Sequence, residues 1–123
     1  MNATMKAQRA YSTASAPTRT SKDIEYDAMA RITHKIRSSA QKGPTGYRSL
    51  VEALHDNRKL WDIFAVEVAD ANNPLPSDLK ARLFYLAEFT RHHTSRVLAK
   101  QETVDALVEI NTSVLRGMRG GDI

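Results

Sequence analysis

Four histidines are the residues of this chain best suited to bind a metal ion or to transfer protons. His92 and His93 are adjacent in a stretch with helical spacing, and adjacent helical side chains point about 100° apart, so they do not easily hold one ion together. His34 and His55 stand alone, and the chain contains no cysteine. We therefore expect no metal site and no cofactor.

The sequence motifs from which common enzymes build their active sites are missing. The chain has no nucleophile elbow, no phosphate-binding loop and no paired-carboxylate motif. Without cysteine it also has no thiol nucleophile. We therefore expect a protein that is not an enzyme.

Asn111 is the most informative polar residue, because it falls in the middle of an otherwise apolar stripe. An unpaired amide is costly to bury, so this side chain needs a partner inside the protein. We expect a hydrogen bond to backbone that pins the helix in register. The alternative is a polar contact with a bound peptide.

The elements that position these residues should all be helices, because apolar residues recur at spacings of three and four without strand-like alternation. Short connections between long amphipathic helices favour antiparallel neighbours, so we expect a compact all-α antiparallel bundle of about four main helices. The expected helices begin at Thr20 or Ser21, near Tyr47, with Pro76 in the first turn of the third, and near Thr103. The second should run to about Ala69, and the expected stops are Lys42 to Gly46, Asn72 to Pro76 and Gly120-Gly121.

Large apolar side chains should form the core of this bundle, above all Trp61, whose ring has the largest apolar area. The predicted core residues are Leu54, Trp61, Leu83, Leu86, Leu107 and the polar Asn111. The predicted inward stripe of the first helix is Ile24, Ala28, Ile32 and Ile36, and that of the second is Tyr47, Leu50, Val51, Leu54, Trp61, Ala65 and Val68.

The second helix changes character after Leu60, where apolar side chains point in nearly all directions round its axis. Such a segment is typical of a central helix that its neighbours cover on every side. In the alternative, Ile63 and Val66 join Phe84 or Leu98 in an exposed apolar groove. That groove would receive an amphipathic helix from a partner protein.

Positive charge is concentrated in the first part of the chain. Residues 1 to 48 carry nine Lys or Arg against three acidic residues, a net of +6, and the remainder carries nine against eleven, a net of −2. The basic half would attract nucleic acid or an acidic protein surface, although a solvated face is the plainer interpretation.

We expect one domain over residues 1 to 123, with residues 1 to 20 forming a short docking helix and a linker. The helix is expected around Thr4 to Tyr11, and the linker from Ser12 to Thr20. Our hypothesis is that this helix covers apolar surface of the bundle and gives way to a partner helix. No stretch has the roughly 18 apolar residues that a membrane span needs, so we expect a soluble, cytoplasmic protein.

Several short segments, in their order and spacing, are similar to the landmarks of one known family. They are Asn57-Arg58-Lys59-Leu60-Trp61, Asn73-Pro74-Leu75-Pro76, Arg91-His92-His93-Thr94-Ser95, Ile110-Asn111 and Gly117-Met118, with Ala10-Tyr11 and Glu25-Tyr26 nearer the start. With these segments the chain resembles the FlaF family of bacterial flagellar biosynthesis regulators. In one respect it departs from the family, which often has glycine between the last two helices. Leu98 to Thr103 contains none, which predicts a stiffer hinge or two nearly continuous helices.

This resemblance implies a cytoplasmic, alphaproteobacterial type of protein that binds flagellin as an export chaperone or adaptor. It also implies an influence on flagellin synthesis together with the regulator FlbT. The alternative is a regulator whose basic N-terminal half binds flagellin messenger RNA directly. The sequence has no recognised RNA-binding signature and no interleaving of aromatic and basic residues, so protein binding is favoured.

Overall fold

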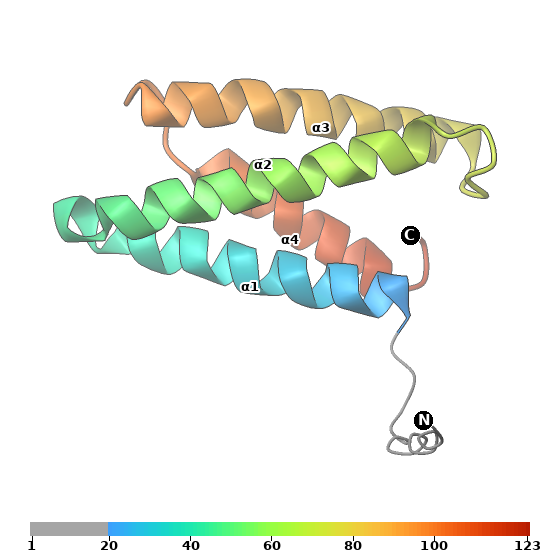
Figure 1. The fold of residues 1–123 in the computed structure, drawn as a ribbon, viewed down its shortest axis with the longest axis horizontal. Helices are drawn as coiled ribbons and strands as arrows, with labels where there is room; N and C mark the ends of the chain where they lie inside the picture. Colours follow the sequence, from blue (N-terminus) through green and yellow to red (C-terminus); the bar gives the residue numbers. More distant parts are fainter. Residues whose placement is uncertain (1–19) are drawn as a thin grey trace, which may run out of the picture.

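Four α-helices and one short 3-10 helix make up residues 20 to 123, the part of the chain that the computed structural model describes. They are α1 (Ser21–Gln41), η2 (Gly43–Gly46), α2 (Tyr47–Ala69), α3 (Ser77–Leu98) and α4 (Asp105–Arg119). Consecutive helices run antiparallel, α2 lies between α1 and α3, and α4 crosses behind α2 (Figure 1). The predicted all-α bundle is confirmed. The docking helix and linker predicted for residues 1 to 20 lie outside the described residues, except for Thr20.

The ends of the helices follow from local sequence. Thr20 begins α1 with a capping box, in which its Oγ1 accepts a hydrogen bond from the Asp23 backbone N–H over 3.1 Å and the Asp23 side chain accepts from Thr20 N–H over 3.2 Å. The observed bounds of α2 are those predicted. Pro76 lies just before α3 rather than in its first turn, because its ψ of 147° is extended.

Gly46 brings the start of α2 close to the end of α1. A Cβ atom at this position would lie 2.3 Å from the Ser39 carbonyl oxygen, so only glycine fits without a shift of backbone. Gly43, with a φ of 63°, turns the chain in the left-handed region just before it. The two glycines explain why the chain reverses direction within a few residues of the end of α1.

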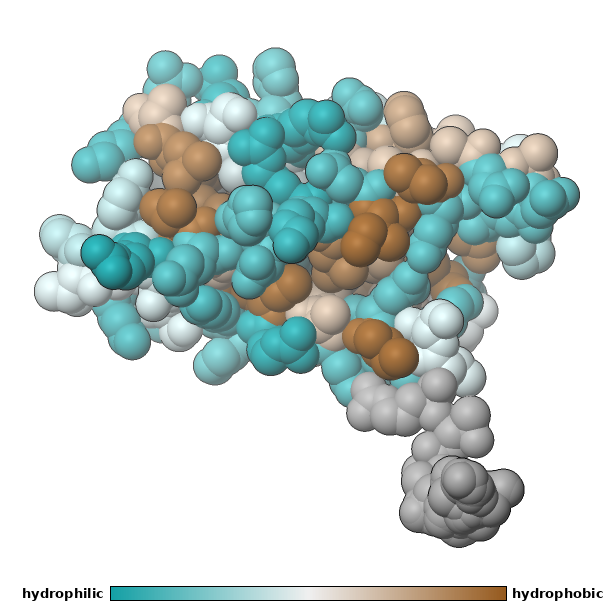
Figure 2. Space-filling model, viewed as in Figure 1, coloured by the Kyte–Doolittle hydropathy of each residue, from teal (hydrophilic) through white to brown (hydrophobic). Residues whose placement is uncertain are grey.

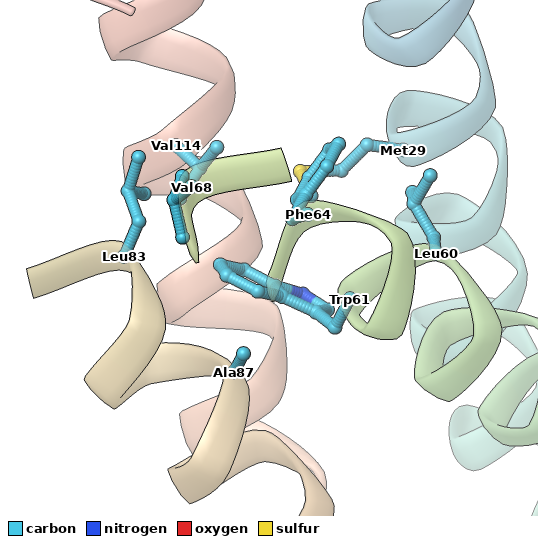
Figure 3. Packing of buried hydrophobic residues seen from close by; sticks show 8 residues of the cluster. All are labelled: Met29, Leu60, Trp61, Phe64, Val68, Leu83, Ala87 and Val114. Carbon is cyan, nitrogen blue, oxygen red and sulfur yellow. The ribbon is translucent and has the colours of Figure 1, made fainter. Parts of the chain in front are cut away.

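The apolar core consists of two clusters of buried side chains along the bundle. Trp61 and Phe64 meet edge to face in the first, with ring centroids 5.4 Å apart (Figure 3). The first cluster contains Met29, Leu60, Trp61, Phe64, Val68, Leu83, Ala87 and Val114, and the second contains Ile36, Ala53, Leu54, Val97, Val104 and Leu107. Of the residues predicted to form the core, Leu86 is half-buried against the first cluster, and Leu54, Trp61, Leu83, Leu107 and Asn111 are buried.

The predicted stripes are partly wrong, because the buried faces of α1 and α2 are rotated from them. Ile24, Tyr47 and Val51 are exposed, whereas Ala53 and Asn57 are completely buried. The physical reason is that α1 packs on this side of α2 and the Asn111 side chain of α4 reaches Asn57, so that the face centred on Asn57 is covered although it carries a small and a polar residue. Hydrophobicity alone does not identify such a face.

The connection between α3 and α4 contradicts one of the two alternatives for this segment, that these helices are nearly continuous, and leaves the alternative of a stiffer hinge. Lys100 takes the left-handed conformation with a φ of 61° and closes the end of α3. Its N–H donates to the Val97 carbonyl over 2.9 Å, and Gln101 N–H donates to the Arg96 carbonyl over 2.8 Å. This is the hydrogen-bond pattern of a glycine cap, made here by lysine.

Candidate partner-binding surface

Three apolar side chains on the outer side of α2 and α3 remain exposed, and we call them the outer apolar face: Ile63, Val66 and Phe84. Their exposed fractions are 51%, 73% and 43%. Figure 2 shows apolar side chains along α2 on the side turned away from α4, separated by hydrophilic ones. Within residues 20 to 123 nothing covers these side chains, so α2 is central between α1 and α3 without being enclosed on every side.

The position of this face follows from the helical period. Trp61, Phe64 and Val68 point into the first core cluster, and Val66 lies between them on the opposite side of α2. Phe84 belongs to the first half of α3, which lies beside the last half of α2 because the two helices are antiparallel. The alternation of core and surface positions therefore brings apolar residues to both sides of this helix.

Leu98 does not join the outer apolar face. It is the last residue of α3, at the opposite end from Phe84, and it packs half-buried against the second core cluster. Of the four residues predicted to bind a partner, Ile63, Val66 and Phe84 are exposed on the neighbouring helices α2 and α3, whereas Leu98 is half-buried at the far end of α3.

An ion pair crosses between α2 and α3 next to the outer apolar face. Arg91 Nη2 lies 2.6 Å from Asp62 Oδ1, and both side chains are more than half exposed. Exposed pairs contribute about 0 to 1 kcal/mol to stability, so its main effect is to place charge at the rim of the apolar surface.

A hollow of about 1120 Å³ lies at one end of the bundle, and we call it the end groove. The end of α1, the starts of α2 and α4 and the end of α3 meet there. Its apolar lining is Pro44, Tyr47, Leu50, Val97, Val104 and Val108. Arg37 and Lys100 lie on it together with acidic Glu102, Asp105 and Glu109. The groove has no local signal in the sequence, because it is assembled from the ends of four helices.

Behind α2 lies a cluster of buried polar side chains, Thr33, Asn57, Trp61 and Asn111, which we call the polar centre. Trp61 Nε1 donates to Asn111 Oδ1 over 2.9 Å, and Asn111 Nδ2 donates to Asn57 Oδ1 over 2.8 Å and to Thr33 Oγ1 over 3.0 Å. The expectation that Asn111 bonds to backbone was wrong. Its partners are side chains of α1 and α2 instead, because α4 places the Asn111 amide in the interior against Thr33, Asn57 and Trp61.

The two adjacent histidines have different environments. His93 is buried, stacks on the Phe89 ring at 5.2 Å between centroids, and donates from Nε2 to the Thr103 carbonyl over 3.0 Å. His92 is exposed. His93 therefore ties α3 to the connection that leads into α4. No group of three or more His, Asp or Glu side chains within residues 20 to 123 is arranged to hold a metal ion.

A second, smaller hollow of about 180 Å³ lies at the end of the bundle where α1 begins and α2 ends, and we call it the glutamate pocket. The Glu25 carboxyl on its wall is hydrogen-bonded to Glu67. Burial raises the pKa of Glu25 from about 4.5 to about 7, the hydrogen bond and negative charge of Glu67 act in the same direction, and Lys22 opposes them. The pocket therefore holds two neighbouring carboxyl groups, and the positive charge of Lys22 offsets their negative charge only in part.

The fold and these surfaces define the class of the protein: residues 20 to 123 form a small antiparallel bundle of four α-helices with exposed apolar side chains on its surface. None of the helices in the described part of the chain is both long and apolar enough to cross a bilayer. The family model described as flagellar protein FlaF matches residues 7–118. The chain therefore belongs to the FlaF family of flagellar proteins, as the sequence segments indicated. Neither the curated proteins nor the solved structures include a match to it.

Proposed function

We propose that this chain is a cytoplasmic, non-enzymatic adaptor that binds flagellin, supports its export and adjusts its synthesis together with FlbT. Membership of the FlaF family supports the flagellar part of this proposal. The observation that supports helix binding is the outer apolar face, where Val66 is 73% exposed beside Ile63 and Phe84. Flagellin ends in amphipathic helices, whose apolar sides need cover before assembly.

The geometry of the outer apolar face fits recognition of a helix. Ile63 and Val66 are three residues apart on α2, and Phe84 projects from the helix beside it, so a partner helix would lie along two neighbouring ridges. The Asp62–Arg91 pair at the rim offers both signs of charge to polar residues of the partner. Binding here would shield apolar side chains of both proteins and prevent premature polymerisation of flagellin.

Direct binding to purified flagellin tests this proposal. Ile63→Asp and Val66→Asp should each lower the affinity roughly tenfold or more, because a carboxylate would be buried without a partner. Tyr85→Asp is the matched control, since Tyr85 is a 64% exposed aromatic residue next to Phe84 and lies outside the outer apolar face. Tyr47→Ser tests the end groove in the same assay. Loss of binding in Tyr47→Ser alone would assign the flagellin site to the end groove. An unchanged affinity in every variant would reject both the outer apolar face and the end groove as the binding site.

The salt dependence of binding separates this function from direct RNA regulation. Apolar contacts should make the flagellin complex only modestly weaker between low and physiological salt. Contacts between basic residues and RNA phosphates would weaken the complex by orders of magnitude over this range. Tight, steeply salt-dependent binding to the flagellin transcript, without binding to flagellin, would overturn the adaptor proposal.

A further inference from the structure

The glutamate pocket lies at the place where the chain enters the bundle. Lys22 and Glu25 from the first turns of α1 form one side, and Glu67 from the end of α2 faces them. Its apolar lining includes Phe64, Val68, Leu75, Leu83, Val114 and Met118, so all four α-helices or their connections contribute to it. The pocket thus combines an apolar floor with two carboxyl groups at its side.

The size of the pocket limits what enters it. Small-molecule sites commonly have volumes of about 300 to 1,000 Å³, and this hollow of about 180 Å³ is smaller. It suits one large side chain rather than a ligand or a whole helix. An occupant that also carries positive charge would offset the repulsion between the carboxyl groups of Glu25 and Glu67.

The segment before Thr20 has this chemistry. Residues 1 to 19 contain the basic residues Lys6, Arg9 and Arg19 and no acidic residue, and their large apolar side chains are Met1, Met5 and Tyr11. The match to the FlaF family begins at residue 7, so much of this segment belongs to the family pattern.

The length of this segment allows it to reach the pocket. It joins the bundle at Thr20, two residues before Lys22 and five before Glu25 on the pocket wall. The nine residue-to-residue steps from Tyr11 to Thr20 span at most roughly 30 Å when extended, which is ample for a return to the first turns of α1. Attachment so close to the pocket also gives the segment a high effective concentration there.

We propose that residues 1 to 19 bind in the glutamate pocket of their own chain, with Arg9 beside the carboxylates of Glu25 and Glu67 and Tyr11 against the apolar floor. Binding places a guanidinium beside the Glu25 carboxyl, which favours the ionised form of Glu25. It also covers Leu75 and Met118, which are half-buried in the bundle of residues 20 to 123.

The first test is an NMR titration of the Glu25 carboxyl in the full-length chain. We expect its pKa to be higher in Lys6→Gln/Arg9→Gln than in the unaltered chain, since the variant lacks the guanidinium proposed to lie beside the carboxyl. The control is Arg48→Gln/Lys59→Gln, which removes the same charge from exposed positions of α2 outside the pocket. A pKa of about 7 in all three chains, with unchanged methyl signals of Val68 and Met118, would overturn the proposal.

Disulfide trapping gives an independent test, because the chain has no cysteine of its own. Tyr11→Cys/Pro74→Cys should oxidise rapidly to an intramolecular disulfide, since Pro74 lines the pocket. Tyr11→Cys/Pro44→Cys places the second thiol at the opposite end of the bundle and should oxidise more slowly. Equal oxidation rates in the two double variants would contradict binding of Tyr11 in the glutamate pocket. A disulfide that joins two chains and becomes rarer on dilution would show that the pocket is filled by a second copy, which would also overturn the proposal.

Discussion

The indole Nε1 of Trp61 donates a hydrogen bond to Oδ1 of Asn111 over 2.9 Å, joining α2 to α4 in the interior of the bundle. The backbone of α4 packs on α1 and, to a smaller extent, on α3, and it does not approach α2 closely. The space between α2 and α4 is therefore spanned by side chains. The length of tryptophan and the short amide of asparagine together make this connection possible.

Removal of the Asn111 amide should destabilise the protein strongly. Asn111→Leu keeps the number and branching of the side-chain heavy atoms but leaves the buried Trp61 N–H without its acceptor, and such an unpaired group costs about 1 to 3 kcal/mol. Urea unfolding followed by Trp61 fluorescence measures the change. Thr112→Ala is the control, because that hydroxyl bonds only to the Val108 carbonyl in its own helix. Equal stability of Asn111→Leu and the wild type would show that the polar centre contributes nothing to stability.

Thr90 and Thr94 form a matched pair with opposite expected effects. Both are buried on α3, but Thr94 Oγ1 donates to the Thr90 carbonyl over 2.6 Å, whereas Thr90 Oγ1 has no hydrogen-bond partner within residues 20 to 123. Thr90→Val should stabilise the fold by about 1 kcal/mol, and Thr94→Val should destabilise it by a similar amount. Thermal unfolding of both variants checks the difference, and destabilisation of both equally would mean that the Thr90 hydroxyl is satisfied.

Lys100→Gly should stabilise the protein by about 1 kcal/mol, because glycine takes the left-handed conformation without the steric cost that lysine bears. Lys100 also lies with Nζ 5.7 Å from the centre of the Tyr47 ring, a contact that the substitution removes. Lys100→Ala is the control: it loses the same contact but retains the unfavourable backbone, so it should give no gain. Calorimetric unfolding measures the stability of the two variants. A gain in stability in both would assign the effect to the loss of the lysine side chain.

The pH dependence of stability should change when the basic residues before α1 are removed. In Lys6→Gln/Arg9→Gln/Arg19→Gln the Glu25 pKa of about 7 lies above its unfolded value of about 4.5, so the folded chain holds the extra proton between these pH values. The stability that this extra proton contributes is complete below about pH 4.5 and is lost as the pH rises through about 7. Stability of this variant should thus fall from pH 5 to pH 8.

Glu25→Gln in the same background is the control for this pH effect. Glutamine cannot ionise, so the part of the pH dependence that Glu25 causes should disappear. Urea unfolding at pH 5 and pH 8 provides the comparison. An unchanged slope after Glu25→Gln would assign the effect to other groups.

The boundaries of the helices could be predicted well because the signals are local. Glycine and proline between α1 and α2, and the Asn-Pro segment after α2, end helices through backbone geometry that needs no knowledge of neighbours. The buried faces of α1 and α2 were harder to predict than the boundaries. Val51 and Ile24 satisfy the apolar period but lie on the solvent side, while Asn57 is buried because Asn111 of α4 reaches it.

The candidate surface could be predicted only in part. Ile63 and Val66 were identified because they fall off the inward stripe, which is a property of α2 alone. The grouping of Phe84 with them, and the separation of Leu98, depend on how α3 lies beside α2. The end groove and the glutamate pocket could not be predicted, because each is built from several helix ends that only the tertiary structure brings together.

The hydrogen bond between Asn111 and Thr33 closes a loop of 78 residues, which has a consequence for the order of folding. The α1–α2 and α2–α3 pairs form from neighbouring segments, so they need little loss of chain entropy. Docking of α4 on α1 closes the longest loop and comes after them. We therefore expect substitutions at Asn111 to accelerate unfolding and to leave the refolding rate almost unchanged. A newly synthesised chain would then display the α2 side of its polar centre until its last helix arrives.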